Sequence, residues 1–246
     1  PAVRFLDAAI GSLGFYSVNI TNSAATQDAF GDYPRPYRKY LRRIEHGLDA
    51  PLARLSRADV LSRYAIPDDG LILLTAGRLC EQKGQDRAIR ALAQIGGARL
   101  VLAGGGPDEP RLRELARSLS IADRVHFVGI LTRDEIGDML GAVDMLVSPS
   151  VWETFGLAAV EAAMAGVPIV AADLPVLREV LSAGGSSPVV FVDAEKPGAL
   201  AEAIEAQRQK TRESAEIQSF RDAIKDKYSQ GRMLSSYDAL IFGTGR

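Results

Sequence analysis

The feature that most constrains the fold is a regular alternation of two kinds of segment through the middle of the chain. Six short runs are almost continuously apolar, which is typical of strands covered on both faces. The stretches between them repeat apolar residues with a period near 3.6, as amphipathic helices do. This alternation predicts βαβ units and a doubly wound parallel sheet. The predicted strands are Leu71–Ala76, Leu100–Ala103, Val125–Val128, Met145–Val147, Ile169–Ala171 and Val189–Val192, and the predicted helices are Gln85–Ile95, Glu109–Leu119, Asp134–Gly141, Gly156–Ala165 and Pro197–Gln207.

The rest of the chain divides around this α/β domain, which we place at residues 66–210. Residues 47–65 are predicted to be a linker and lead-in helix, since glycine and proline interrupt the pattern at His46–Pro51. Residues 1–46 contain one strand-like run, Phe15–Ile20, followed by a short helix. Residues 211–246 are polar, with a helical pattern up to about Leu240.

Length, net charge and cysteine content exclude several classes of protein. A chain of 246 residues can form one α/β domain and part of another. The net charge of -2 argues against a nucleic-acid-binding surface, and no apolar run approaches the ~20 residues that cross a membrane. Cys80 is the only cysteine, so no disulfide can form within the chain. A cytoplasmic location, with or without membrane association, fits this composition.

Glycines and charged residues follow the predicted strands at the point where each strand ends. In an open α/β sheet, ligands bind beyond the carboxyl ends of the strands. The same edge of the sheet therefore combines glycines that allow close backbone approach, two cations and at least two carboxylates. These residues are Gly77, Arg78, Lys83 and Gly84, then Gly104–Gly106, Gly129, Ser148–Ser150, Glu153–Gly156 and Asp173.

Arg78 and Lys83 lie on one predicted strand–helix loop. A forked guanidinium and an ammonium suit a diphosphate, whereas two isolated charges would simply be solvated. Gly84 at the start of the next helix and the shared sheet edge favour the diphosphate site.

Glu153 precedes a predicted helix that contains Glu161. Gly156 would leave room for a ligand against the backbone, and the free N–H groups of the helix start would attract an anion. The two carboxylates could accept hydrogen bonds from sugar or ribose hydroxyls. Alternatively, Glu153 caps the helix and Glu161 is exposed. The apolar neighbours Val160 and Ala162 argue against that alternative, because a carboxylate among them is rarely left unpaired.

Other candidates for chemistry are weaker. Gly104–Gly106 lacks the sixth-place glycine of a dinucleotide-binding loop, so it indicates a tight turn. Cys80 has no histidine that could serve as its partner, and His46 and His126 stand alone. No metal-ligand spacing is present, so we predict neither a metal nor another cofactor.

Taken in order, these residues resemble the retaining GT-B glycosyltransferases of family four, which share a "glycosyl transferases group 1" domain. The resemblance covers roughly residues 44–206. Each motif alone is weak, but the ordered set is specific. The matching segments are Gly77-Arg78-Leu79, Lys83-Gly84, Gly104–Pro107, Val125–Gly129, Ala142–Asp144, Glu153–Leu157 with Glu161, separated from Glu153 by seven residues, Ala165–Ala171 and Glu179.

The resemblance implies a donor site for a nucleotide sugar of the UDP or GDP type. Residues that match Arg78 and Lys83 bind the donor diphosphate in that family and stabilise the charge of the departing nucleoside diphosphate. The match to Glu153 contacts the donor sugar, so these three residues are the predicted catalytic set. Backbone amides around Phe155, Gly156 and Leu157 lie near sugar and phosphate, the match to Glu161 holds the ribose, and Gly129-Ile130 lies near the base. Family members usually need no metal, and transfer retains the anomeric configuration.

Two departures from the family pattern concern the linker and the last strand. The usual Asn-Gly-Val-Asp linker is His46-Gly47-Leu48-Asp49 here, so no role follows for position 46. Ser182–Pro188 is longer than the usual glycine-rich turn before the last strand.

The third departure is length. The family's first, acceptor-binding domain is a Rossmann-like domain of well over ~100 residues, and about 45 residues precede the linker here. Residues 1–46 are therefore expected to be a remnant of it, and residues 211–246 to be helices that cross back toward it. On this expectation the chain belongs to a longer enzyme, whose missing part would supply any peripheral membrane contact.

Two functions from different classes follow. The first is an enzyme that transfers a sugar from the nucleotide-sugar donor to a glycan, lipid or small-molecule acceptor. The second is a binding module that holds a nucleotide sugar but is inactive without the missing acceptor domain. A sugar epimerase that shares the GT-B fold is a third option, which Glu153-Thr154-Phe155-Gly156 with Glu161 fits less well.

Overall fold

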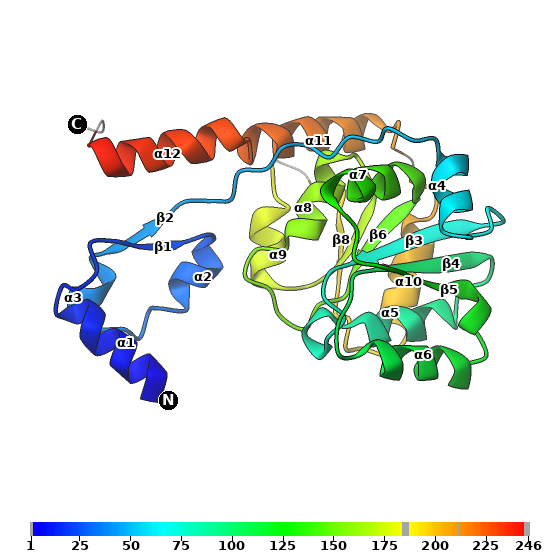
Figure 1. Cartoon of the computed structure of the whole chain (residues 1–246), viewed down its shortest axis with the longest axis horizontal. Coiled ribbons are helices and arrows are strands. Elements are labelled where there is room, and N and C mark those ends of the chain that lie inside the picture. The colour runs from blue at the N-terminus through cyan, green and yellow to red at the C-terminus, as the bar shows by residue number, and fades with distance from the viewer. Residues whose placement is uncertain (1, 184–186, 211, 244–246) are drawn as a thin grey trace. The chain divides into compact units, whose positions relative to one another are not determined.

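The computed structural model describes residues 2–183, 187–210 and 212–243 (Figure 1). The chain consists of two compact units. One contains residues 50–226, and the other combines residues 1–49 with residues 227–246. Each unit is described below by itself.

A six-stranded parallel sheet forms the centre of the unit of residues 50–226. The spatial order β5-β4-β3-β6-β7-β8 is that of a doubly wound fold, with its switch point between β3 and β6. All six predicted strands are confirmed, and the largest difference is that β4 begins two residues earlier than expected. The strands are β3 (Leu71–Ala76), β4 (Ala98–Ala103), β5 (Val125–Gly129), β6 (Met145–Ser148), β7 (Ile169–Ala172) and β8 (Val190–Val192).

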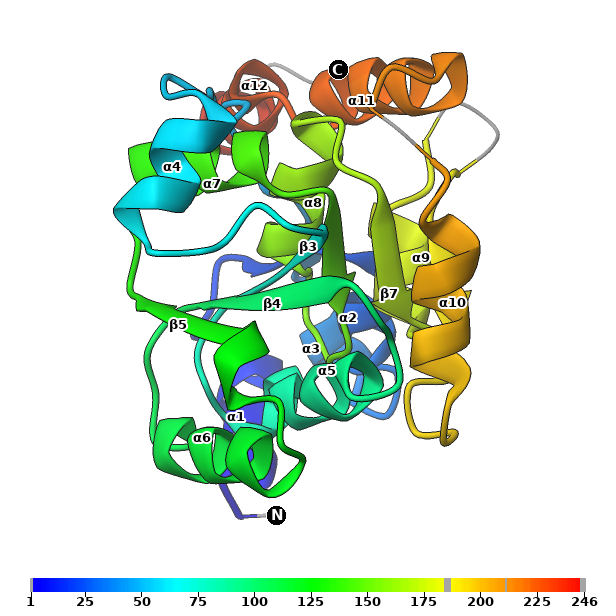
Figure 2. The same ribbon diagram turned by 90° about the vertical axis from the view of Figure 1, so that its right-hand side faces the viewer.

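Helices cover both faces of this sheet (Figures 1 and 2). The predicted helices are present, with ends shifted by up to three residues. One helix, α9, is not among those predicted, because six residues that begin with a proline give little periodic signal. The helices are α4 (Arg57–Arg63), α5 (Gln85–Leu92), α6 (Glu109–Ser118), α7 (Arg133–Ala142), α8 (Leu157–Met164), α9 (Pro175–Val180), α10 (Ala199–Gln207) and α11 (Ala215–Lys227), with short 3-10 turns η1 (Glu81–Lys83) and η2 (Ala122–Arg124).

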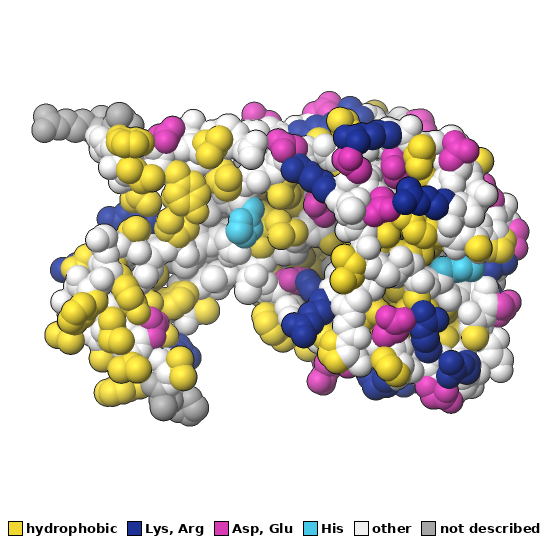
Figure 3. Space-filling view, viewed as in Figure 1, with side chains coloured by type: hydrophobic (Ala, Val, Ile, Leu, Met, Phe, Trp, Pro, Cys, Tyr) yellow, Lys and Arg dark blue, Asp and Glu magenta, His cyan; other side chains and the backbone are white. Residues whose placement is uncertain are grey.

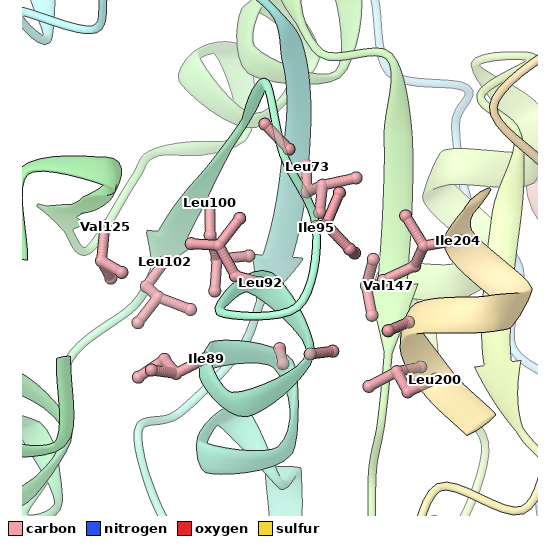
Figure 4. Packing of buried hydrophobic residues seen from close by; sticks show 14 of the residues in the cluster. Leu73, Ile89, Leu92, Ile95, Leu100, Leu102, Val125, Val147, Leu200 and Ile204 are labelled. Carbon is pink, nitrogen blue, oxygen red and sulfur yellow. The ribbon is translucent and has the colours of Figure 1, made fainter. Parts of the chain in front are cut away.

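One apolar core of this unit lies between the sheet and the helices α5, α6 and α10. Figure 4 shows Leu92 of α5 next to Leu100 of β4 and Ile89 of α5 next to Leu102 of β4, and each of these four residues is 0% exposed. Leu200 and Ile204 of α10 extend the same core beside β6 and β7. The continuous apolar runs of β3, β4, β6 and β7 therefore correspond to strands that are buried on both faces, whereas the edge strands β5 and β8 are only partly buried.

Two polar anchors hold the segment that precedes β3. Arg57 of α4 forms ion pairs with Asp68 and Asp144, with N–O distances of 2.8 Å each. Asp144 also accepts a hydrogen bond from the backbone N–H of Ile72 at 2.7 Å. On α7, Asp138 accepts hydrogen bonds from the backbone N–H groups of residues 54 and 55 at 2.6 and 3.0 Å. A Cβ at Gly137 would lie 2.4 Å from the carbonyl oxygen of Leu52, so α7 needs a glycine where this segment crosses it.

The unit of residues 1–49 and 227–246 contains a two-stranded parallel sheet, in which Asn19 pairs with Leu41. Its small core contains Tyr33, Tyr37 and Leu41, and the N–H of Leu48 donates to the carbonyl oxygen of Tyr228 at 2.8 Å. Hydrophobic side chains gather on its surface in Figure 3. The elements are α1 (Ala2–Ser12), β1 (Asn19–Thr21), α2 (Ala24–Asp28), α3 (Arg35–Arg38), β2 (Leu41–Arg43) and α12 (Gln230–Phe242).

The structure corrects the expectation of a strand at Phe15–Ile20. Only Asn19–Thr21 is a strand, and Phe15 is 75% exposed. The partner strand β2 has no apolar pattern of its own, because Arg42 and Arg43 make up two of its three residues. Pairing between β1 and β2 therefore decides where the strand lies. The predicted departure at Ser182–Pro188 includes residues 184–186, which lie outside the described residues.

Candidate active site at the carboxyl edge of the sheet

The loops that follow β3 and β6 are neighbours, because these two strands are adjacent at the switch point of the sheet. The N–H of Val151 donates to the carbonyl oxygen of Gln82 at 2.8 Å. In return, the Gln82 side-chain amide donates to the carbonyl oxygen of Trp152 at 3.2 Å. Gly84 has a φ of +64°, and a Cβ there would lie 2.2 Å from the carbonyl oxygen of Pro149. Gly84 is therefore needed for the close approach of the two loops.

Lys83 and Glu153 form an ion pair across these loops. Lys83 Nζ lies 2.5 Å from Glu153 Oε1, and the Ser150 hydroxyl donates to the same oxygen at 3.0 Å. The Lys83 side chain is 23% exposed and that of Glu153 is 7% exposed. The two residues were predicted from separate motifs, and the structure brings them into direct contact. Ser150 was noted only for its place after a strand, so its contact with Glu153 was not foreseen.

Arg78 lies on the same loop as Lys83 but is exposed. Its backbone carbonyl accepts a hydrogen bond from the Gln85 side chain at 2.9 Å. The Arg78 guanidinium has no hydrogen bond or ion pair with the residues that the structure describes. This cation is therefore available to an anionic ligand.

The helix α8 begins directly after Gly156, which has a φ of +86°. A Cβ at Gly156 would also lie 2.6 Å from Cδ2 of Leu177. Backbone geometry and packing thus account for this glycine, in addition to the predicted room for a ligand. Phe155 is 2% exposed and belongs to the core, whereas Leu157 is 46% exposed. The first N–H groups of α8 have no partner within the helix, as at any helix start.

Glu161 lies on α8 between the buried residues Val160 and Ala162, and it is itself half-buried. Within the described part of the chain its carboxylate has no hydrogen-bond or ion-pair partner. Burial raises the pKa of Glu161 above its ordinary value of 4.5, and the positive charge of Arg133 acts in the opposite direction. A desolvated carboxylate without a partner is costly to the fold, which is typical of a group kept for a ligand.

Glycines shape the other side of this edge. A Cβ at Gly104 would lie 2.0 Å from the carbonyl oxygen of Gly77, and one at Gly106 would lie 2.2 Å from that of Leu79. The glycine run therefore does more than form a tight turn, because it lets the loop after β4 press against the loop that carries Arg78. Gly129 has a φ of +75°, and Ile130, which is 83% exposed, projects from the same edge.

Little enclosed space remains around the ion pair. The cavity lined by Lys83, Ser150, Glu153 and Gly156 has a volume of about 10 Å³, which is room for about one water. A larger ligand must therefore lie outside this cavity. Arg78 and Trp152, on the loops that carry Lys83 and Glu153, are both exposed.

Two other kinds of feature are absent from the described residues. No three His, Cys, Asp or Glu side chains there lie close enough together to hold a metal ion. None of the described helices has the length and apolar character that crossing a membrane requires.

Comparison with known proteins agrees with this architecture. A D-inositol 3-phosphate glycosyltransferase of Catenulispora acidiphila is 37% identical over 177 residues, which are 66% of this chain and 42% of that protein. The O-antigen biosynthesis glycosyltransferase WclY of Escherichia coli is 25% identical over 71% of this chain and 47% of its own length. The chain thus spans less than half the length of either relative.

Solved structures share the fold. Anabaena HepE in complex with UDP and glucose aligns with a TM-score of 0.81 and 24% identity, over 92% of this chain and 63% of that one. Sucrose-phosphate synthase from Thermosynechococcus elongatus aligns with a TM-score of 0.75 and 24% identity, over 92% and 58%. These similarities confirm the predicted α/β fold of the GT-B type.

The sequence model of one family covers most of the unit of residues 50–226. The model described as "Glycosyl transferases group 1" matches residues 57–219, which include every residue of the candidate site. Because this match extends over about two thirds of the chain, the protein belongs to the glycosyl transferases group 1 family.

Proposed function

We propose that this chain carries the donor site of a retaining glycosyltransferase that moves a sugar from a nucleoside-diphosphate sugar to a glycan, lipid or small-molecule acceptor. The observation that carries the proposal is the half-buried Glu161 carboxylate without a partner, on the same helix that begins beside the Lys83–Glu153 pair. Family membership and relatives named as glycosyltransferases favour transfer over a module that only binds nucleotide sugars.

Each residue has a chemical role in this proposal. Arg78 and Lys83 bind the diphosphate and stabilise the charge that grows on the leaving group, so that no metal ion is required. Glu153 accepts a hydrogen bond from the transferred sugar, and Glu161 accepts hydrogen bonds from the ribose hydroxyls. Amides from Phe155 to Leu157 lie beside sugar and phosphate, and Gly129-Ile130 lies beside the base.

The Lys83–Glu153 ion pair adds a step to this scheme. A diphosphate that binds Lys83 competes directly with Glu153 for the same ammonium group. We propose that donor binding separates the pair and turns the Glu153 carboxylate toward the sugar. The Ser150 hydroxyl, which donates to Glu153, keeps one hydrogen bond to the carboxylate during this exchange.

The nucleotide is proposed to be UDP or GDP. UDP is the nucleotide in the aligned HepE complex, which supports the first of these for this chain. A calorimetric screen of UDP, GDP and ADP with their sugar conjugates tests the donor, and release of the nucleoside diphosphate in the presence of acceptors tests transfer.

Glu161→Ala is the decisive variant for the site. It should weaken binding of the nucleoside diphosphate by about 10- to 100-fold, since a charged hydrogen bond to the ribose is lost. Arg117→Ala, which alters an exposed ion pair on α6, is the control and should bind normally. Normal donor binding by Glu161→Ala would contradict the assignment of this residue.

A further inference from the structure

Exposed apolar side chains in the unit of residues 50–226 gather at the edge that carries the site. Four large ones follow the carboxyl ends of strands: Ile130 after β5, Val151 and Trp152 after β6, and Leu157 at the start of α8. Apart from these, the described exposed ones are Leu52 and Leu55, in the segment before α4. Trp152 is the only tryptophan in the sequence and is 55% exposed. An exposed aromatic side chain beside a polar site is typical of ligand recognition.

The backbone of Trp152 is fixed relative to the charged centre. Its carbonyl oxygen accepts the hydrogen bond from Gln82, and Gln82 precedes Lys83 in the sequence. The next residue, Glu153, is 7% exposed and turned inward to Lys83. Trp152 does not line the small cavity around this pair. Trp152 is therefore an exposed aromatic residue whose backbone is tied to the loop that carries Lys83, and it is the sequence neighbour of a carboxylate that can bind sugar hydroxyls.

This combination suits one class of ligand. A pyranose ring has hydroxyls around its edge and an apolar face made of C–H groups. A carboxylate accepts hydrogen bonds from the hydroxyls, and the flat indole ring stacks on the apolar face. We propose that Trp152 is the platform on which a pyranose ring stacks at the mouth of the site. This inference rests on the proposed function and adds to it a residue that selects for the ring.

The ring could come from either substrate, the donor's own sugar or a sugar of the acceptor, and the fluorescence of a single tryptophan distinguishes the two. The chain is titrated with UDP, GDP and ADP and with their glucose conjugates while Trp152 emission is followed. A change with the conjugate that the diphosphate alone does not cause identifies the donor sugar. A change when glucose or maltose is added to the diphosphate-saturated chain identifies the acceptor side.

Variants measured by calorimetry test the same contact. Trp152→Ala should weaken binding of the responding sugar ligand by about tenfold and leave the diphosphate within about twofold. Trp152→Phe, which keeps an aromatic face, should recover most of this loss, whereas Trp152→Leu should not. Leu52→Ala removes another exposed apolar side chain of the same unit and should leave the affinities for the sugar ligand and the diphosphate unchanged. Thermal unfolding of all variants should match that of the wild type, because Trp152 is exposed.

The outcomes separate this inference from the proposed function. Suppose that a nucleoside diphosphate binds, but no sugar ligand changes the Trp152 emission or binds more weakly to Trp152→Ala. The stacking platform is then overturned and the donor site stands. If Trp152→Leu binds the sugar as well as Trp152→Phe does, stacking is overturned in favour of simple apolar contact. If no nucleotide binds, the proposed function itself fails, and the platform fails with it.

Discussion

At the scale of single residues, the two glutamates of the candidate site have opposite electrostatic surroundings. Glu153 is almost fully buried but is paired with Lys83 and Ser150. Glu161 is half-buried and has no partner among the described residues, so burial raises its pKa. The sequence predicted both as ligand groups from their places before and within one helix and from the family resemblance. It could not predict that one is neutralised by a residue of the other motif, because that contact depends on the adjacency of β3 and β6.

The raised pKa of Glu161 predicts how Glu161→Gln changes stability with pH. The folded protein holds this proton more tightly than the unfolded chain, so ionisation of Glu161 lowers the free energy of unfolding as pH rises through and above 4.5. The variant has no charge to desolvate. It should therefore be more stable than the wild type at pH 7, while its nucleotide affinity falls because a charged hydrogen bond to the ribose is lost. The gain should disappear when urea unfolding is measured below pH 4.5.

Glu153→Gln is the matched control and should lower the free energy of unfolding at pH 7, whereas Glu161→Gln raises it. It leaves Lys83 without its charged partner, and loss of a hydrogen bond to a charged group costs about 1.5–3 kcal/mol. If both variants changed stability in the same direction at pH 7, the contrast between a paired and an unpaired carboxylate would be wrong.

At the scale of elements, hydrophobic periodicity predicted the strands of the six-stranded sheet and most of the helices that cover it. The strands of the main sheet are apolar on both faces, so their sequence signal is strong and local. Two of the elements that it missed lack such a signal, since α9 has only six residues and β2 is mostly arginine. It also missed α1, Ala2–Ser12. For Gly104 and Gly106 the sequence predicted a tight turn and close backbone approach, but not their packing against Gly77 and Leu79, because that contact depends on the path of a loop that is distant in sequence.

The packing of these loops predicts a strong effect of Gly106→Ala. Its Cβ would meet backbone atoms of Leu79, with the nearest at 2.2 Å, and backbone cannot move aside cheaply. We expect a loss of about 1–3 kcal/mol in the free energy of unfolding and weaker nucleoside diphosphate binding, because the loop that carries Arg78 is displaced. Gly96→Ala is the control, since nothing lies within 4 Å of its Cβ, and it should fall within about 0.5 kcal/mol of the wild type. Equal stability of the two variants, measured by urea unfolding, would refute this role for Gly106.

At the scale of the whole molecule, the compact unit around the main sheet is longer than the domain that the sequence pattern predicted. The predicted α/β domain, residues 66–210, lies inside the unit of residues 50–226. The added segments carry no strand of the sheet, which explains why strand–helix alternation did not include them. They do contribute contacts: Arg57 joins α4 to Asp68 and Asp144, and α11 buries Ile217 and Phe220.

These contacts predict that a fragment of residues 50–226 folds by itself and binds the nucleoside diphosphate, whereas a fragment of residues 66–210 does not fold stably. The shorter fragment loses the Arg57 ion pairs and the buried face of α11, and it exposes the apolar surface that they cover. A loss of several kcal/mol corresponds to a fall in melting temperature of about 10 °C or more at this size. Calorimetric melting and titration of both fragments with UDP or GDP check this, with Lys83→Ala in the longer fragment as the binding control. Equal melting temperatures would mean that the core within residues 66–210 alone determines stability, and failure of the longer fragment to fold would mean that the two units depend on each other.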